Sequence, residues 1–147
     1  MRAVVTRVSS ASVEIDGVVT GEIGRGFLVL LGIKSGDTKA HADKLASKIC
    51  GLRVFSDEEG KMNLDLSAAG GEILVISQFT LYADCKSRRP GFTQAARPDA
   101  AIPLYEYFVS KCKNAGFTVE TGVFGAMMSV SSVNDGPVTI IIDTENV

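Results

Sequence analysis

Residues 70–84 have the sequence GGEILVISQFTLYAD, and the rest of the chain is organised around them. Two glycines open the stretch, and the apolar run from Ile73 to Ile76 follows them. A β-branched, apolar run bounded by glycines predicts a strand that is buried on both faces. Ser77, Gln78 and Thr80 nevertheless stand in its middle, although burying a polar side chain without a partner costs about 1–3 kcal/mol.

These polar residues have two interpretations. Alternate residues of a strand share a face, so Gln78 and Thr80 would point one way while Ser77 and Phe79 point the other. In the first interpretation the polar groups only satisfy one another or the neighbouring backbone. In the second they form a functional site on a rigid strand. The stretch alone leaves both open.

Length and composition limit the class of protein. The 147 residues, of which 46% are hydrophobic, predict a single domain over 1–147 with a proper core. A net charge of −2 excludes a global basic field, so any nucleic acid would bind through a local patch. No apolar run approaches the roughly 20 residues of a membrane span, and the N-terminus lacks signal-peptide features. Three cysteines without CxxC spacing favour a reduced, cytoplasmic protein.

The remaining pattern predicts about eight short strands and two helices. The helices are expected at roughly 38–51, with Asp37 as N-cap, and 100–114, with Asp99 as N-cap and Pro103 near the first turn. Asp16-Gly17 predicts a hairpin turn. Besides the central strand, strands are expected at 2–9, 13–15, 18–23, 27–33, 117–121, 123–133 and 138–143, with two shorter candidates at 52–55 and 62–66. Strands without regular alternation with helices favour an α+β fold, a β-rich, barrel-like antiparallel or mixed sheet with helices on one side.

Several kinds of catalytic chemistry have no support in the sequence. The single histidine, His41, stands near the start of the first predicted helix and has no partner for a zinc site or a Ser-His-Asp triad. No glycine-rich phosphate loop is present, and no metal or cofactor is expected. Cys85 stands beside basic residues and is a candidate nucleophile without an evident base. An enzyme of this sequence would therefore work by positioning and fixed dipoles.

A second unusual stretch is NDGPVT at 134–139. Its glycine before proline predicts a tight turn, and an X-Pro bond is the one peptide linkage where the cis form is common. Taken alone, the stretch fits an ordinary hairpin corner.

Together, SQFTL at 77–81 and NDGPVT at 134–139 resemble the D-aminoacyl-tRNA deacylase family. The opening 33 residues resemble that family's first hairpins, and GVFGAMMSVSSVNDGPVTIIIDT at 122–144 resembles its C-terminal sheet. The similarity runs from Met1 to about Thr144. Two separated motifs in the right order and at the right distance make the resemblance specific.

The resemblance implies a barrel-like homodimer that proofreads translation by hydrolysing the ester between a D-amino acid, or mischarged glycine, and the tRNA 3′-end. It implies that the site floor consists of Ser77, Gln78, Phe79 and Thr80. It implies a chiral filter, a cis Gly136-Pro137 pair that enters the partner's pocket and rejects L-aminoacyl-tRNA. It further implies that Arg7 supports this pair, and that the wall beside the adenosine consists of Phe124, Gly125, Ala126 and Met127.

The mechanism implied by the resemblance agrees with the missing protein base. Side chains orient the ester and polarise its carbonyl, while the 2′-hydroxyl of the terminal ribose helps to activate water. A nucleophilic Thr80 ranks second, because no base stands beside it. The dense positive loop Lys86, Arg88 and Arg89, with Arg97 nearby, is the candidate tRNA contact.

One departure from the family pattern and several rival functions remain. The family usually has a glycine and then RPSF in the loop after the central strand, whereas this chain has Ser87 and Gly91 at those two places. The rivals are a non-catalytic tRNA- or peptide-binding module, a small-molecule esterase using Thr80 or Cys85, and a relative with a trans Gly-Pro bond acting on L-alanine mischarged to tRNA.

Overall fold

A computed structural model describes residues 1–147. Eight strands and two α-helices make up the fold, with one 3-10 helix after β6. In chain order the elements are β1 (Arg2–Ile15), β2 (Val18–Ile23), β3 (Gly26–Gly32), α1 (Lys39–Cys50), β4 (Phe55–Ser56), β5 (Met62–Leu64), β6 (Glu72–Ser77), η1 (Phe79–Tyr82), α2 (Pro98–Asn114), β7 (Val119–Thr121) and β8 (Ser129–Asp143). No helix is long and apolar enough to span a membrane.

A mixed sheet forms the centre of the molecule. Its strand order is β2-β1-β3-β6-β7, and β8 pairs with β1 as well. β1 is antiparallel to its three partners, whereas the pairs β3–β6 and β6–β7 are parallel, with α1 and α2 in the two crossovers. The sheet curls until β2 lies against β7, where a Cβ at Gly21 would stand 2.7 Å from the carbonyl oxygen of Thr121. The predicted α+β fold with a nearly closed mixed sheet is therefore confirmed.

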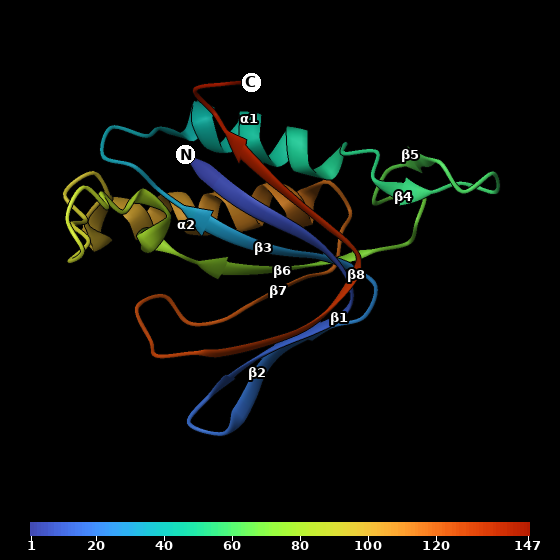
Figure 1. The fold of residues 1–147 in the computed structure, drawn as a ribbon, viewed down its shortest axis with the longest axis horizontal. Helices are drawn as coiled ribbons and strands as arrows, with labels where there is room; N and C mark the ends of the chain where they lie inside the picture. The colour runs from blue at the N-terminus through green and yellow to red at the C-terminus, as the bar shows by residue number, and fades with distance from the viewer.

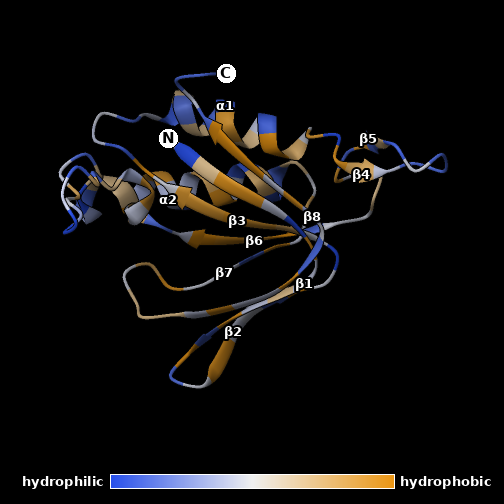
Figure 2. Cartoon of the chain, viewed as in Figure 1, coloured by the Kyte–Doolittle hydropathy of each residue, from blue (hydrophilic) through white to orange (hydrophobic).

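Side-chain alternation divides the core into two parts. Phe27 and Val29 of β3 point with Ile73 and Val75 of β6 toward α1 and α2, which cover one side of the sheet (Figure 1). The intervening residues face the inside of the curled sheet, where a smaller cluster forms: Val8, Ala11, Val13, Ile23, Leu28, Leu74 and Ile76. Colouring by hydropathy shows that β3 and β6, which lie between the two parts of the core, are largely apolar (Figure 2). Both faces of β6 are thus buried, as its sequence predicts.

The strand boundaries differ from the prediction in three places. The segments 2–9 and 13–15 form one continuous strand, β1, which pairs with β3 through its first half and with β2 through its second. The predicted strand over 123–133 is wrong in its first half, since β8 begins at Ser129 and residues 122–128 form a loop. β8 then continues through 134–137, where a turn between two strands was predicted, because β1 pairs with it on both sides of that stretch.

Both helices begin at other residues than predicted. Thr38, not Asp37, is the N-cap of α1, because Asp37 accepts the Lys34 N–H at 2.7 Å and the Met1 amine at 2.9 Å. α2 begins at Pro98 after an Arg97 N-cap, so Pro103 lies inside the helix and not in its first turn. Pro103 is on the solvent side, where water can satisfy the carbonyl that its missing N–H would have bonded.

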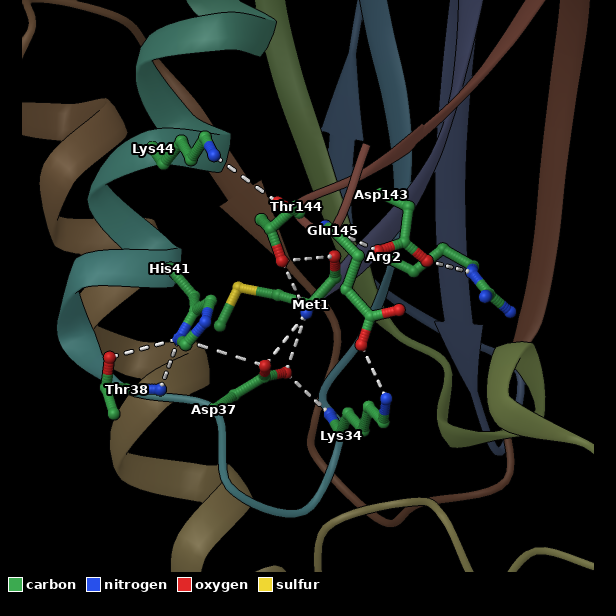
Figure 3. A network of polar contacts seen from close by, with 10 residues as sticks. All are labelled: Met1, Arg2, Lys34, Asp37, Thr38, His41, Lys44, Asp143, Thr144 and Glu145. Atoms are coloured by element: carbon green, nitrogen blue, oxygen red, sulfur yellow. Dashed lines mark hydrogen bonds and ion pairs between the residues drawn. The ribbon is translucent and has the colours of Figure 1, made fainter. Parts of the chain in front are cut away.

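A polar network joins the first residues of β1 to the end of β8 and the start of α1 (Figure 3). The Met1 amine contacts Asp37 and the Thr144 hydroxyl, each at 2.9 Å. The Arg2 Nε donates to the buried Asp143 carboxylate at 2.8 Å. Burial disfavours the charge on Asp143, but the Glu145 N–H and the Arg2 guanidinium outweigh it and lower the pKa of Asp143. The network therefore needs this carboxylate ionised.

We expect Asp143→Asn to lower the free energy of unfolding by about 1–3 kcal/mol at pH 7, because it leaves the Arg2 guanidinium without its charged partner. A carboxyl whose pKa is lowered on folding stabilises the protein above its unfolded pKa and loses this effect as pH falls. The difference between wild type and variant should therefore narrow as pH falls below about 4. Urea unfolding of wild type and variant at pH 7 and at a pH below about 4 measures this difference in the free energy of unfolding. Glu59→Gln, at an exposed carboxylate, is the matched control.

Candidate active site

The central strand ends earlier than its apolar pattern predicts. β6 stops at Ser77, and residues 79–82 form the 3-10 helix η1, so the predicted alternation of Gln78 and Thr80 does not apply. Gly32 at the end of β3 allows this, since a Cβ there would stand 3.2 Å from the Gln78 carbonyl oxygen. The polar residues therefore lie at the carboxyl end of a buried strand, half-buried or exposed. Because these polar side chains stay in contact with solvent, burial imposes no desolvation cost on them, and they are free to contact a ligand.

A cavity of about 450 Å³ opens at this end of β6. Mostly apolar residues line it, which is usual for a small-molecule site. They come from β3 and the residues after it (Leu31, Ile33), from β6 and η1 (Ile76–Thr80), from around the start of α2 (Ala96, Ala101), and from the loop before β8 and its first residues (Phe124–Met128, Val130). The structure thus brings together both predicted groups, 77–80 and 124–127.

The polar groups of the cavity include no proton acceptor suited to activate a hydroxyl. The Gln78 side-chain amide donates a hydrogen bond to the Thr80 hydroxyl, which makes no bond with a carboxylate or an imidazole. His41 is used elsewhere, because its Nδ1 accepts the Thr38 N–H at 2.9 Å as part of the capping box of α1. The cavity is therefore equipped to orient and polarise a bound group rather than to attack it.

Two aromatic pairs hold the walls of the cavity in place. Phe79 meets Phe92 edge to face, with ring centroids 5.1 Å apart, which ties η1 to the loop that follows it. On the other side Phe124 meets Tyr105 of α2 at 5.9 Å. The Tyr105 hydroxyl donates to the Val75 carbonyl oxygen at 2.8 Å, and burial raises its pKa to about 12. Tyr105 is thus a fixed support between α2, β6 and the wall.

Gly136 and Pro137 do not line the cavity of their own chain. They lie on exposed β8, joined by a cis peptide bond, and the pairing with β1 is irregular around them. Arg7 of β1 holds this stretch, since its Nε donates to the Asp135 carbonyl oxygen at 3.2 Å and its Nη1 to the Val54 carbonyl oxygen at 2.6 Å. The φ of Gly136 is +119°, and a Cβ there would stand 3.0 Å from the Arg7 Nη2. Only glycine is unstrained at this position.

The basic loop after η1 is a short hairpin on the surface. Asp84 and Gly91 exchange backbone hydrogen bonds of 2.7 and 2.9 Å, and Lys86, Arg88 and Arg89 are exposed between them. Gly91 has no neighbour within 4 Å of an added Cβ and no left-handed φ, so a serine would fit there. The Ser87 hydroxyl donates to the Arg89 carbonyl oxygen at 2.6 Å. The two departures are therefore compatible with an ordinary hairpin.

Comparison with known proteins places this arrangement in a family. The profile of the family described as D-Tyr-tRNA(Tyr) deacylase matches residues 4–143, nearly the whole chain. The chain belongs to this deacylase family. It is 58% identical over 145 residues to the D-aminoacyl-tRNA deacylase of Thermus aquaticus, covering 98% of this chain and 95% of that protein. It is 55% identical over 148 residues to that of Thermosipho africanus, covering 100% and 99% of the two chains.

Solved structures show the same fold as this member of the deacylase family. One is described as the c-Myc DNA Unwinding Element Binding Protein, with a TM-score of 0.92, 40% identity, and coverage of 97% of this chain and 98% of that one. Another, described as a probable eukaryotic D-amino acid tRNA deacylase, has a TM-score of 0.82 at 18% identity, with coverage of 96% and 97%. At that identity the second likeness concerns the fold alone.

Sequence reasoning missed part of the lining of this candidate cavity. The residues it did not find are the apolar ones contributed by other elements: Leu31, Ile33, Ala96, Ala101, Met128 and Val130. They carry no chemical signal of their own and become site residues only through the packing of β3, α2 and β8 around η1. The contact of Phe92 with Phe79 likewise depends on the three-dimensional structure.

Proposed function

We propose that the protein hydrolyses the ester of D-aminoacyl-tRNA, and of glycine mischarged on tRNA, and leaves L-aminoacyl-tRNA intact. One observation carries the proposal. A single apolar cavity collects all of 77–80 and 124–127, while Gly136-Pro137 stands outside that cavity in an exposed position. The names of the curated relatives, D-aminoacyl-tRNA deacylases, support the reaction class.

The cavity offers separate places for the two halves of the substrate. The terminal adenosine would lie against the wall Phe124–Met127, of which Phe124 is fixed by Tyr105. The ester would lie over Ser77, Gln78 and Thr80, whose polar atoms orient it and polarise its carbonyl. Because no protein base contacts Thr80, the ribose 2′-hydroxyl would help to activate the attacking water. Positioning and electrostatic stabilisation together then supply the rate enhancement.

The position of the Gly136-Pro137 pair supports the proposal of a homodimer with a shared site. β8 pairs with β1 only, and it carries exposed apolar residues, including Val133 at 59% and Ile141 at 69% exposure. Exposed apolar strands of this kind mark interaction surfaces. We place a second copy of the chain on this face, so that the Gly136-Pro137 backbone of each protomer enters the partner's cavity and holds the substrate's α-amino group.

Contact with the tRNA body is assigned to the basic loop. Lys86, Arg88 and Arg89 are exposed, and only Lys86 has an acidic neighbour, Asp84, at 4.0 Å. Phe92, which follows this loop, contacts Phe79 at the cavity, and this supports a tRNA contact close to the site. The surrounding chain has a net charge of −2, so tRNA attraction would be local. Such a substrate agrees with a cytoplasmic protein.

Thr80→Ala separates positioning from covalent catalysis. If Thr80 only helps to orient the ester, we expect kcat to fall by about tenfold or less, whereas loss of a nucleophile costs about 10⁴-fold or more. Single-turnover cleavage of D-tyrosyl-tRNA measures the difference. A loss of several orders of magnitude, with the fold intact, would establish the threonine mechanism instead. Thr20→Ala, a change of the same kind at an exposed position of β2 that does not line the cavity, is the matched control.

The proposed reaction is tested by comparing two D-tyrosine esters. Intact protein should release D-tyrosine from D-tyrosyl-tRNA and leave D-tyrosine ethyl ester largely uncleaved, because the ethyl group makes no contact with the adenosine wall. Equal cleavage of both esters would indicate a small-molecule esterase. Binding of D-tyrosyl-tRNA without cleavage would indicate a non-catalytic tRNA-binding module.

A further inference from the structure

A second cavity, of about 370 Å³, adjoins the candidate active site across Phe124. Phe124 lines both cavities, so the two meet at this residue. Ala101 of α2 faces the first cavity, and Ile102, the next residue, faces the second. A polymer whose last unit fills the first cavity can thus pass directly into the second.

One face of α2 forms the long side of the second cavity. Ile102, Glu106, Val109 and Lys113 line it at spacings of four, three and four residues, which places them on a single helix face. From Ile102 to Lys113 the helix rises about 16 Å at 1.5 Å per residue. The opposite side comes from Thr121, the last residue of β7, and residues 122–124 after it. The cavity is therefore an elongated groove that leads away from the active site.

The groove carries two charges that have no partner within the chain. Neither Glu106 nor Lys113 forms an ion pair or a side-chain hydrogen bond, and both are exposed. Lys111, on a neighbouring face of the same helix, instead pairs with Asp43 at 3.3 Å. Val123, 52% exposed, adds an apolar surface beside Phe124. The groove thus offers a hydrogen-bond acceptor for a base edge, a cation for a phosphate and an apolar surface for a base ring, which are the groups that bind a nucleotide.

We propose that this groove binds the penultimate nucleotide of the tRNA, the cytidine that precedes the terminal adenosine. The assignment rests on the function proposed above and adds a second subsite to it. The cytosine ring lies on Val123 and the edge of Phe124, its N4 amino group donates to the Glu106 carboxylate, and Lys113 meets a backbone phosphate. Carboxylates are suited to accept from cytosine N4, and apolar surfaces to contact unstacked bases.

The test uses short esters that differ by one nucleotide. D-Tyrosyl-adenosine and D-tyrosyl-CpA are compared through kcat/KM in the intact protein, and we expect the dinucleotide ester to be about 10-fold better, within the range for one base on an apolar platform. D-Tyrosyl-UpA lacks the N4 amino group and should lose most of the gain. If CpA and adenosine esters are cleaved equally, the subsite is overturned while the proposed function stands. If neither short ester is cleaved while D-tyrosyl-tRNA is, the subsite is overturned and the proposed function stands; loss of D-tyrosyl-tRNA cleavage as well overturns both.

Variants of the groove identify the residues responsible. Within each variant the readout is the ratio of kcat/KM for CpA ester to that for adenosine ester, so any effect of the substitution on folding cancels. Glu106→Gln should abolish the preference for the CpA ester over the UpA ester. Lys113 lies at the end of the groove away from the active site, so Lys113→Met should lower the ratio only for a 5′-phosphorylated pCpA ester. Lys111→Met, on the same helix but outside the groove, should keep the wild-type ratio. Arg88→Ala, in the basic loop proposed to contact the tRNA body that these esters lack, should also keep it. A ratio that responds to Arg88→Ala and not to the groove variants would place the nucleotide at the basic loop.

Discussion

Intact protein is expected to cleave D-tyrosyl-tRNA and glycyl-tRNA while leaving L-tyrosyl-tRNA essentially untouched. The discrimination should be at least about 1,000-fold in kcat/KM, or about 4 kcal/mol, because a steric clash rejects a substrate more sharply than a missing contact does. In the proposed site the backbone of Gly136-Pro137 meets the α-carbon of the substrate, so no side chain can be removed to relax the filter. Glycine has no side chain to clash and must be accepted. Single-turnover deacylation of the three charged tRNAs measures the effect.

The choice of D substrate and of the L control makes this comparison decisive. D-Phenylalanyl- and D-aspartyl-tRNA should be cleaved at rates similar to D-tyrosyl-tRNA, since the D side chain would point away from the filter. L-Alanyl-tRNA carries the smallest L side chain and is the most demanding control. Its efficient cleavage would move the protein to the relatives that act on L-alanine mischarged to tRNA. Efficient cleavage of L-tyrosyl-tRNA would contradict the proposed function altogether.

The filter position can be tested at Gly136 itself. Its φ of +119° and the 3.0 Å approach of Arg7 mean that any Cβ shifts the stretch that Arg7 supports. Arg7 also donates to the carbonyl oxygens of Asp135 and Val54. Such a shift would therefore change the direction in which the Gly136-Pro137 pair points. This makes Gly136 the natural place to inactivate one half of a shared site without touching the cavity.

The sequence predicts the apolar core better than the ends of its elements. Both faces of β6 are buried, as the run from Ile73 to Ile76 indicates. The end of β6 depends on Gly32, which lies 45 positions before Ser77 and is in contact only in the folded chain. Asp37 is a reasonable N-cap by local rules, but the Met1 amine and the Lys34 N–H engage it. Tertiary contacts thus override local preferences at these boundaries.

The candidate site shows the same division between local and distant causes. The motifs SQFT and NDGP identify unusual local chemistry, and both lie in unusual places: a strand end and an irregular, exposed part of β8. The turn expected at Asn134 to Pro137 is wrong, because pairing with β1 carries the strand through it. The apolar lining at Leu31 and Ala96 has no local signature, and only the assembled fold places it beside η1.

Mixing two inactive variants should restore activity if the site is shared across a two-fold axis. Ala126→Trp fills its own cavity and keeps its own Gly136-Pro137 pair, whereas Gly136→Val spoils the pair and keeps the cavity. Each variant alone should lose more than about 100-fold of the deacylation rate. Their heterodimer contains one complete site, formed by the cavity of the Gly136→Val protomer and the pair of the Ala126→Trp protomer.

The expected recovery follows from the symmetry of such a dimer. Random reassortment of equal amounts gives heterodimers in half of the molecules, and each has one complete site of two, so about one quarter of wild-type activity should return. Reassortment by dilution or mild urea, followed by D-tyrosyl-tRNA cleavage, measures it. Mixing either variant with itself under the same treatment is the control for refolding. If Gly136-Pro137 instead served the cavity of its own chain, each variant protomer would lack one half of its site, and no mixture could exceed the activity of its parents.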